Sequence, residues 1–252
     1  KDAASGISLT TAAYIGKHAR SFTRWLWRKR GKLTFDPLAG MDLPSQGEGT
    51  KRRAFSTEEL AQLIETTDAS TREFRYLKGP ERSLLYLVAV STGYRAGELA
   101  ALKPANFELD ADVPLARLRG SQTKNGKDAA KPLPPAVVHR LRTYLADRPA
   151  SREVWPGTWA TRAADMLKAD LKAAGIPLAV DDEAALFHSL RHTYTSMLAR
   201  TAPVKVTQDL ARHSTPMLTI GTYSHASLTE KAEAVAALPL PGKSILPSEG
   251  CS

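Results

Sequence analysis

Hydrophobic residues near the start of the chain recur at the spacing of an α-helix. We predict a helix over residues 9–30, because apolar positions at steps of four, three and four form one stripe. This apolar stripe comprises Ile15, Ala19, Phe22 and Leu26. A second stripe on another face of the helix is basic and comprises Lys17, Arg20, Arg24 and Arg28. Such a helix suits packing on a small domain and binding along phosphates, although a solvated basic face has the same pattern.

Residues 31–54 interrupt the helical pattern with prolines and glycines and are predicted to form a linker. A basic run, Lys51, Arg52 and Arg53, closes this segment just before the next helix. A basic linker between two domains that face DNA would follow the phosphate backbone between them.

The rest of the chain predicts mostly helices and one small sheet. Ser56 opens a capping box, which predicts a helix over 56–67. Further helices are predicted at 80–91, just after Arg95, and at 135–147, 158–174, 187–200, 203–211, 216–222 and 227–237. Short strands are predicted at Asn106–Leu109, Leu115–Leu118 and Pro132–Leu133, with a hairpin turn at Asn125-Gly126. The fold class is therefore mostly α with a small antiparallel β-sheet.

The composition favours a polyanionic partner and a reducing compartment. The formal net charge is +9, which favours nucleic acid as a partner, although a generic basic surface gives the same charge. A single cysteine, Cys251, excludes an internal disulfide framework and a four-cysteine zinc site, so we expect a cytoplasmic protein. No apolar stretch reaches the ~20 residues of a membrane span. Because the chain begins at Lys1 rather than Met, we expect further sequence upstream.

Two segments carry basic residues at turns that could hold a phosphate. In S-T-G-Y-R-A-G-E-L, Gly93 ends one helix and Arg95 begins the next, where a guanidinium lies near free backbone amides. Glu98 could pair with Arg95, and an ordinary surface ion pair has the same spacing. In Q-T-K-N-G-K, Lys124 projects from the predicted hairpin tip and Lys127 is a second candidate, although lysines at such tips are usually only solvated.

The segment L-F-H-S-L-R-H-T-Y predicts a histidine and an arginine on one edge of a helix. His188 and Arg191 are three positions apart and could hold one phosphate between them. His188 and His192 are spaced like a metal-binding pair, but Ser189 replaces the glutamate of H-E-x-x-H, so we expect no metal there. We interpret the acidic run at 181–183 as a favourable charge at the start of this helix.

A fourth segment, A-R-H-S-T-P-M-L-T-I-G-T-Y, ends in a tyrosine that alone would indicate only a core residue. Together the four segments resemble the tyrosine recombinase family, also called the phage integrase family, over roughly residues 52–237. Its signature is an Arg in T-G-x-R-x-x-E-L, a hairpin Lys, an H-x-x-R pair, a later His and a Tyr nine or ten residues beyond. This chain supplies them in that order as Arg95, Lys124, His188 with Arg191, His213 and Tyr223.

The resemblance implies a tyrosine recombinase catalytic fold and a division of the chain into domains. The stretch F-D-P-L-A-G at 35–40 resembles the join between core-binding and catalytic domains in this family. We expect the remnant of a helical core-binding domain with its linker at 1–48, the catalytic domain at 49–240 and an irregular tail at 241–252. The expected DNA-binding residues are Lys17, Arg20, Arg24, Arg28, Lys51, Arg52, Arg53 and Lys127.

The resemblance also implies a reaction in which a tyrosine attacks a DNA phosphodiester, leaving a 3′-phosphotyrosyl link and a free 5′-hydroxyl. No metal or cofactor is required, and the partner is double-stranded DNA bound by a homotetramer of a bacterial or phage-encoded, nucleoid-associated protein. The implied roles are nucleophile for Tyr223, base for His188, phosphate ligands for Arg95, Arg191 and His213, acid for Lys124, and support of Arg95 for Glu98.

One departure and several alternatives accompany this interpretation. Arg212 stands where the family usually has glycine, so its side chain either crowds or supplements the phosphate site. The helix predicted at 227–237 either docks on a neighbouring subunit or packs in cis. The alternative functions are a type IB topoisomerase or telomere-resolving enzyme, a catalytically silent DNA-binding regulator on the same fold, and a metal-dependent nuclease.

Overall fold

The computed structural model of the chain describes residues 6–45, 51–123 and 126–212. The chain divides into two compact units, one of residues 1–51 with 180–184, the other of residues 52–179 with 185–252. The helices predicted at 216–222 and 227–237 and the tail at 241–252 lie outside the described residues.

The smaller unit contains helix α1 (Leu9–Arg28), close to the predicted bounds. The chain beyond it is held to the helix by the Thr23 hydroxyl, which donates a hydrogen bond of 2.7 Å to the Asp36 carboxylate. The predicted apolar stripe is only partly covered, because Ile15 and Phe22 are 55% and 58% exposed. Burial falls instead on Ala13, which does not belong to that stripe.

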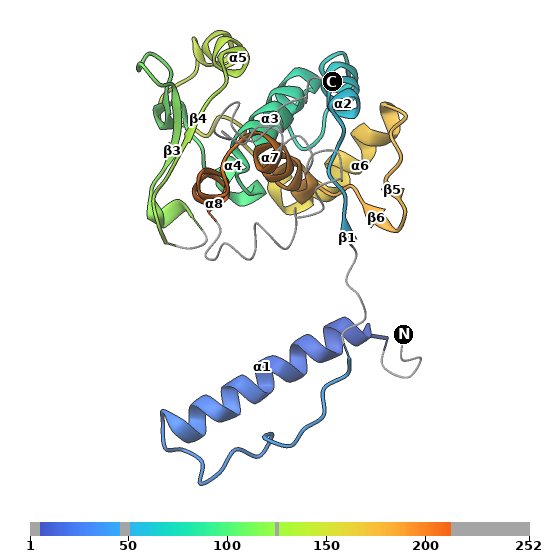
Figure 1. Cartoon of the computed structure of the whole chain (residues 1–252), viewed down its shortest axis with the longest axis vertical. Helices are drawn as coiled ribbons and strands as arrows, with labels where there is room; N and C mark the ends of the chain where they lie inside the picture. Colours follow the sequence, from blue (N-terminus) through green and yellow to red (C-terminus); the bar gives the residue numbers. More distant parts are fainter. Residues whose placement is uncertain (1–5, 46–50, 124–125, 213–252) are drawn as a thin grey trace, which may run out of the picture. The chain divides into compact units, whose positions relative to one another are not determined.

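The larger unit is built mainly from helices, with α3 packed against α2, α5 and α7 (Figure 1). Its helices are α2 (Thr57–Asp68), α3 (Gly79–Thr92), α4 (Ala96–Ala100), α5 (Pro135–Leu145), α6 (Ala163–Ala173), α7 (Phe187–Thr201) and α8 (Val204–Ala211). The capping box predicted at Ser56 is present at the start of α2. The helix predicted over 158–174 is wrong in its first part, where Trp159–Arg162 form a 3₁₀ turn. Within the described ranges, no helix is long and apolar enough to cross a membrane.

An antiparallel sheet flanks these helices, in the order β2 (Phe107–Glu108), β3 (Leu115–Leu118) and β4 (Ala129–Pro132). Ala116 of β3 lies opposite Lys131 of β4. The strand predicted at Pro132–Leu133 is therefore misplaced, since the pairing with β3 begins at Ala129. The alternation of β4 turns Ala129 and Lys131 inward.

A second sheet consists of three two-residue strands in the order β1 (Lys51–Arg52), β6 (Glu183–Ala184) and β5 (Ala179–Val180). Asp181 and Asp182 form the turn between β5 and β6, with positive φ angles of 48° and 63°. Their prediction as charges at the start of the following helix was wrong, because α7 begins after Leu186. Aspartate tolerates the left-handed conformation better than most residues, which suits it to this turn.

The apolar core of the larger unit encloses a buried ionic network around Asp170. Asp170, at 1% exposure, accepts hydrogen bonds from Arg82 Nε at 2.9 Å and from the Tyr86 hydroxyl at 2.7 Å. Arg82 is 0% exposed. Its Nη1 donates to the backbone carbonyls of Arg72 and Leu77, and its Nη2 donates to Asp170 and Ser70. Burial, and then the charge of Asp170, raise the pKa of Tyr86 well above its ordinary value. The network is thus saturated with internal partners, as a purely structural ion pair requires.

Candidate active site

The site begins where α3 ends. Gly93 closes α3 in the left-handed conformation, with φ 63°, and an added Cβ there would lie 2.4 Å from the ring of Tyr194. Arg95 then caps α4, and its backbone N–H donates to the Glu98 carboxylate at 2.9 Å. Its Nη1 also pairs with Glu98, at 3.2 Å. The pairing of Arg95 with Glu98 expected from their spacing is therefore present.

Arg191 joins this turn to two other helices. It lies on α7, is buried, and donates through Nη1 to the carbonyl of Gly93 and through Nη2 to the carbonyl of Ala211 at the end of α8. Gly93 and Arg191 are 98 positions apart in sequence, so the fold itself brings Arg191 to the Arg95 turn. Burial, and then the positive charge of Arg95 and Arg212, lower the pKa of Arg191 to about 10, so its guanidinium stays charged at neutral pH.

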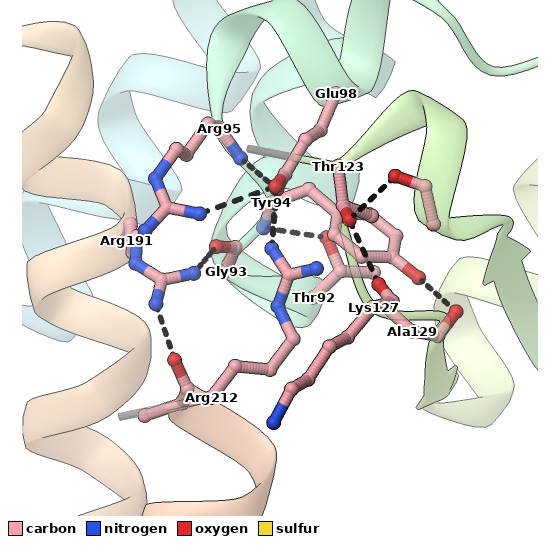
Figure 2. Close-up of polar contacts among 12 residues, drawn as sticks. Thr92, Gly93, Tyr94, Arg95, Glu98, Thr123, Lys127, Ala129, Arg191 and Arg212 are labelled. Carbon is pink, nitrogen blue, oxygen red and sulfur yellow. Dashed lines mark hydrogen bonds and ion pairs between the residues drawn. The ribbon is translucent and has the colours of Figure 1, made fainter. Parts of the chain in front are cut away.

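Arg212 contributes a third guanidinium to the cluster (Figure 2). It caps α8 with φ 53° and ψ 41°, and its Nη2 lies 2.6 Å from both carboxylate oxygens of Glu98. Burial opposes ionisation of Glu98, but hydrogen bonds and charge from Arg212 and Arg95 outweigh it and lower the pKa of Glu98. Among the described residues, Arg95 and Arg212 thus pair with the one carboxylate of Glu98, and Arg191 is close enough to interact with it electrostatically, which leaves an excess of positive charge.

His188 lies one turn before Arg191 on α7, with its side chain toward solvent. Partial loss of hydration, followed by the charges of Arg52, Arg191 and Arg95, lowers the pKa of His188 below that of a free histidine. The imidazole is therefore mostly neutral at pH 7 and able to accept a proton. Arg52, predicted from the linker, is close enough to this site to act on it electrostatically.

The β3–β4 hairpin is attached to the site at its base. The Tyr94 hydroxyl donates to the carbonyls of Ala116 at 2.7 Å and Ala129 at 3.2 Å. Lys127 is exposed, and Figure 2 shows its side chain pointing toward the side of the cluster where Arg212 enters. Lys124 lies outside the described residues, as do His213 and Tyr223.

Lys131 belongs to the site, although the sequence analysis missed it. Its side chain is 1% exposed, with Nζ 5.7 Å from the centre of the Tyr194 ring. Burial, and then the charges of Arg212 and Arg191, lower the pKa of Lys131 to about 7. A strand predicted to begin at Ala129 would have placed Lys131 on the inward face, because side chains alternate between the two faces of a strand.

Most of the other predicted DNA-binding residues belong to the smaller unit. Arg53 is buried and bonded to Glu59 at 2.7 Å and to the Pro177 carbonyl at 2.8 Å, so its guanidinium supports the fold. On α1, Arg20 donates to the carbonyl of Ala39 and Arg24 pairs with Asp36 at 3.7 Å. Four of the predicted residues in the smaller unit have exposed side chains: Lys17, Arg24, Arg28 and Lys51. Among the described residues, no group of three or more His, Cys, Asp or Glu could hold a metal ion.

Known sequences match most of this chain. The sequence profile described as "Phage integrase family" matches residues 53–230. A tyrosine recombinase XerC-like protein of Caldanaerobacter subterraneus subsp. tengcongensis is 26% identical over 253 residues, covering 82% of this chain and 60% of that protein. The tyrosine recombinase XerD of Caulobacter vibrioides is 26% identical over 239 residues, covering 89% of this chain and 73% of that protein. The chain thus spans only about 60% of the length of the first relative.

Solved structures share the fold. The XerH site-specific recombinase bound to a palindromic difH substrate superposes with a TM-score of 0.66 at 18% identity, covering 93% of this chain and 69% of that one. The Tn1549 transposon integrase in complex with transposon right end DNA gives a TM-score of 0.63 at 16% identity, covering 92% and 86%. The mostly helical architecture with small antiparallel sheets is therefore the fold of tyrosine recombinase and integrase catalytic domains.

Proposed function

The chain belongs to the phage integrase family, and on this basis we propose that it is a site-specific DNA recombinase that acts through a tyrosine nucleophile. We assign the catalytic domain to residues 49–240 and the core-binding remnant with its linker to 1–48. The reaction would integrate or excise a mobile element. Double-stranded DNA is the substrate, and a homotetramer on two paired sites is the expected assembly.

The observation that carries the proposal is the arginine cluster around Glu98. Arg95 and Arg191 come from distant parts of the chain and lie in one cluster with more positive than negative charge. Such preorganised guanidiniums bind a phosphodiester and stabilise the additional charge of a phosphorane. A single surface ion pair would not need a second buried arginine held between two backbone carbonyls.

The proposed chemistry combines this cluster with Tyr223, Lys124 and His213, whose roles are those that the family resemblance implies. The Tyr223 phenol forms a bond to phosphorus while the bond to the 5′-oxygen breaks, and the phenolic proton passes to neutral His188. Lys124 gives a proton to the departing 5′-oxygen, and His213 donates a hydrogen bond to the phosphate. The phosphotyrosyl link conserves the energy of the broken bond, so a second strand can be joined without ATP. In this scheme the cations of the protein take the place of a metal ion.

The first experiment traps covalent protein–DNA adducts. The protein is incubated with a random duplex library in EDTA, and SDS-resistant adducts are compared with those of Tyr223→Phe. We expect an adduct with the unmutated protein alone, and sequencing of the trapped DNA then defines a substrate.

Each other outcome has a definite meaning. Equal adducts from both proteins would exclude Tyr223 as the nucleophile. Adducts that form only when a divalent metal is supplied would exclude the metal-free mechanism. DNA binding without any adduct would favour a silent regulator on the same fold.

A further inference from the structure

Arg212 occupies a backbone conformation that disfavours a side chain. Its φ of 53° and ψ of 41° are left-handed, and helices that end in this way usually carry glycine there. The family also usually has glycine at this place. An arginine that keeps this conformation needs a compensating interaction, and observed backbone strain of this kind is concentrated at functional sites.

The guanidinium of Arg212 is only partly used by the protein. Nη2 bonds to Glu98, and the carbon of the guanidinium lies 5.6 Å from the centre of the Tyr94 ring. The side chain is 9% exposed, yet Nε and Nη1 are buried without a hydrogen-bond partner among the described residues. Two buried charged donors without acceptors are unfavourable unless a ligand supplies acceptors.

A comparison with Arg82 separates this arrangement from a structural ion pair. Arg82 is fully buried, and all of its guanidinium nitrogens donate to Asp170, Ser70 or backbone carbonyls. Arg212 instead has two nitrogens left over. It also lies in the same cluster as Arg95 and Arg191, which carries excess positive charge (Figure 2). A phosphate oxygen at Nη1 would satisfy that donor and balance the excess charge.

We propose that Arg212 is a third phosphate-binding arginine, which donates from Nη1 to a non-bridging oxygen of the scissile phosphodiester while Nη2 holds Glu98. This inference rests on the proposed recombinase function. It also gives a reason for the departure from glycine, because the side chain supplements the phosphate site. Removal of one such donor group from a catalytic site lowers the rate by ~10²–10³-fold.

The test measures the rate of adduct formation on the DNA defined by trapping. Arg212→Met removes the donors and keeps the apolar stem, and Arg212→Gly also relieves the left-handed backbone. The matched control is Arg148→Met, because Arg148 likewise pairs with a glutamate, Glu81, and covers a tyrosine ring, that of Tyr144. Each protein is assayed with the scissile phosphodiester and with both phosphorothioate diastereomers, in which sulfur replaces one non-bridging oxygen.

We expect both Arg212 variants to be ~10²–10³-fold slower on the phosphodiester and the control to be unchanged. For the diastereomer with sulfur at the contacted oxygen, the ratio of the phosphodiester rate to the phosphorothioate rate should fall toward one in the Arg212 variants, because the donor to that oxygen is gone. Wild-type rates in both variants, or slower rates with both sulfur penalties unchanged, would overturn the assignment. Failure of the wild-type protein to form any adduct would refute the recombinase function itself, which is a separate result.

Discussion

Lys131 gives a prediction that depends only on the architecture of the site. Its ammonium is almost fully buried near Arg212 and Arg191, and its pKa is lowered to about 7. The unfolded chain restores the ordinary lysine pKa, so between pH 7 and about 10.4 it binds a proton that the native state lacks. Unfolding free energy must therefore rise with pH across this window. Lys131→Met keeps the length of the side chain and removes this contribution.

The size of the effect follows from the pKa difference. Each pH unit over which the unfolded chain binds one more proton than the native state adds about 1.4 kcal/mol to the free energy of unfolding. Because the native amine is half protonated at pH 7, the free energy of unfolding rises by about 2 kcal/mol between pH 7 and 9. Urea unfolding is measured at pH 7, 8 and 9 through the fluorescence of the buried Trp155 and Trp159. Wild type should gain about 2 kcal/mol more than Lys131→Met over this range. Equal pH dependence in the two proteins would show that the lysine is hydrated or paired, and the reasoning would be wrong.

Two further substitutions test the Glu98 cluster and the Gly93 turn. Glu98→Gln leaves buried arginine charge uncompensated and should lower the free energy of unfolding in urea by about 3 kcal/mol. Glu108→Gln removes a charge from an exposed ion pair and should leave the urea midpoint unchanged. Similar shifts in both variants would contradict the argument from burial. Gly93→Ala forces Cβ against Tyr194 and should lower both the melting temperature and the yield of adduct, while Gly97→Ala, with nothing within 4 Å of the new Cβ, should do neither. Equal behaviour of the two alanine variants would show that the turn tolerates a side chain.

Local signals in the sequence predicted much of the larger unit. The capping box at Ser56, the break at Gly93 and the pairing of Arg95 with Glu98 each depend on residues within a few positions of one another. Periodicity located α7 for the same reason, since its apolar residues repeat along one helix. Interactions of this range are visible in the order of the residues alone.

Features set by distant contacts were less predictable. Strand β4 begins with two alanines, which have little intrinsic preference for a strand, so only its pairing with β3 defines it. Lys131 was missed for that reason. The position of the Arg212 side chain depends on a left-handed backbone and on Glu98, which lies 114 positions away in sequence. The residue types alone therefore could not decide whether this side chain crowds or supplements the phosphate site.

The pairing of β3 with β4 also constrains how this hairpin can change in evolution. Ala129 and Lys131 face inward, and Ala130 and Pro132 face outward. Insertion of one residue inside the strand would reverse this parity and replace the inward lysine with alanine or proline. Tyr94 fixes the base of the hairpin through Ala116 and Ala129, so length changes between residues 119 and 128 leave the register intact. In homologous genes, we therefore expect insertions and deletions within these two strands to add or remove two residues at a time, which keeps Lys131 facing inward.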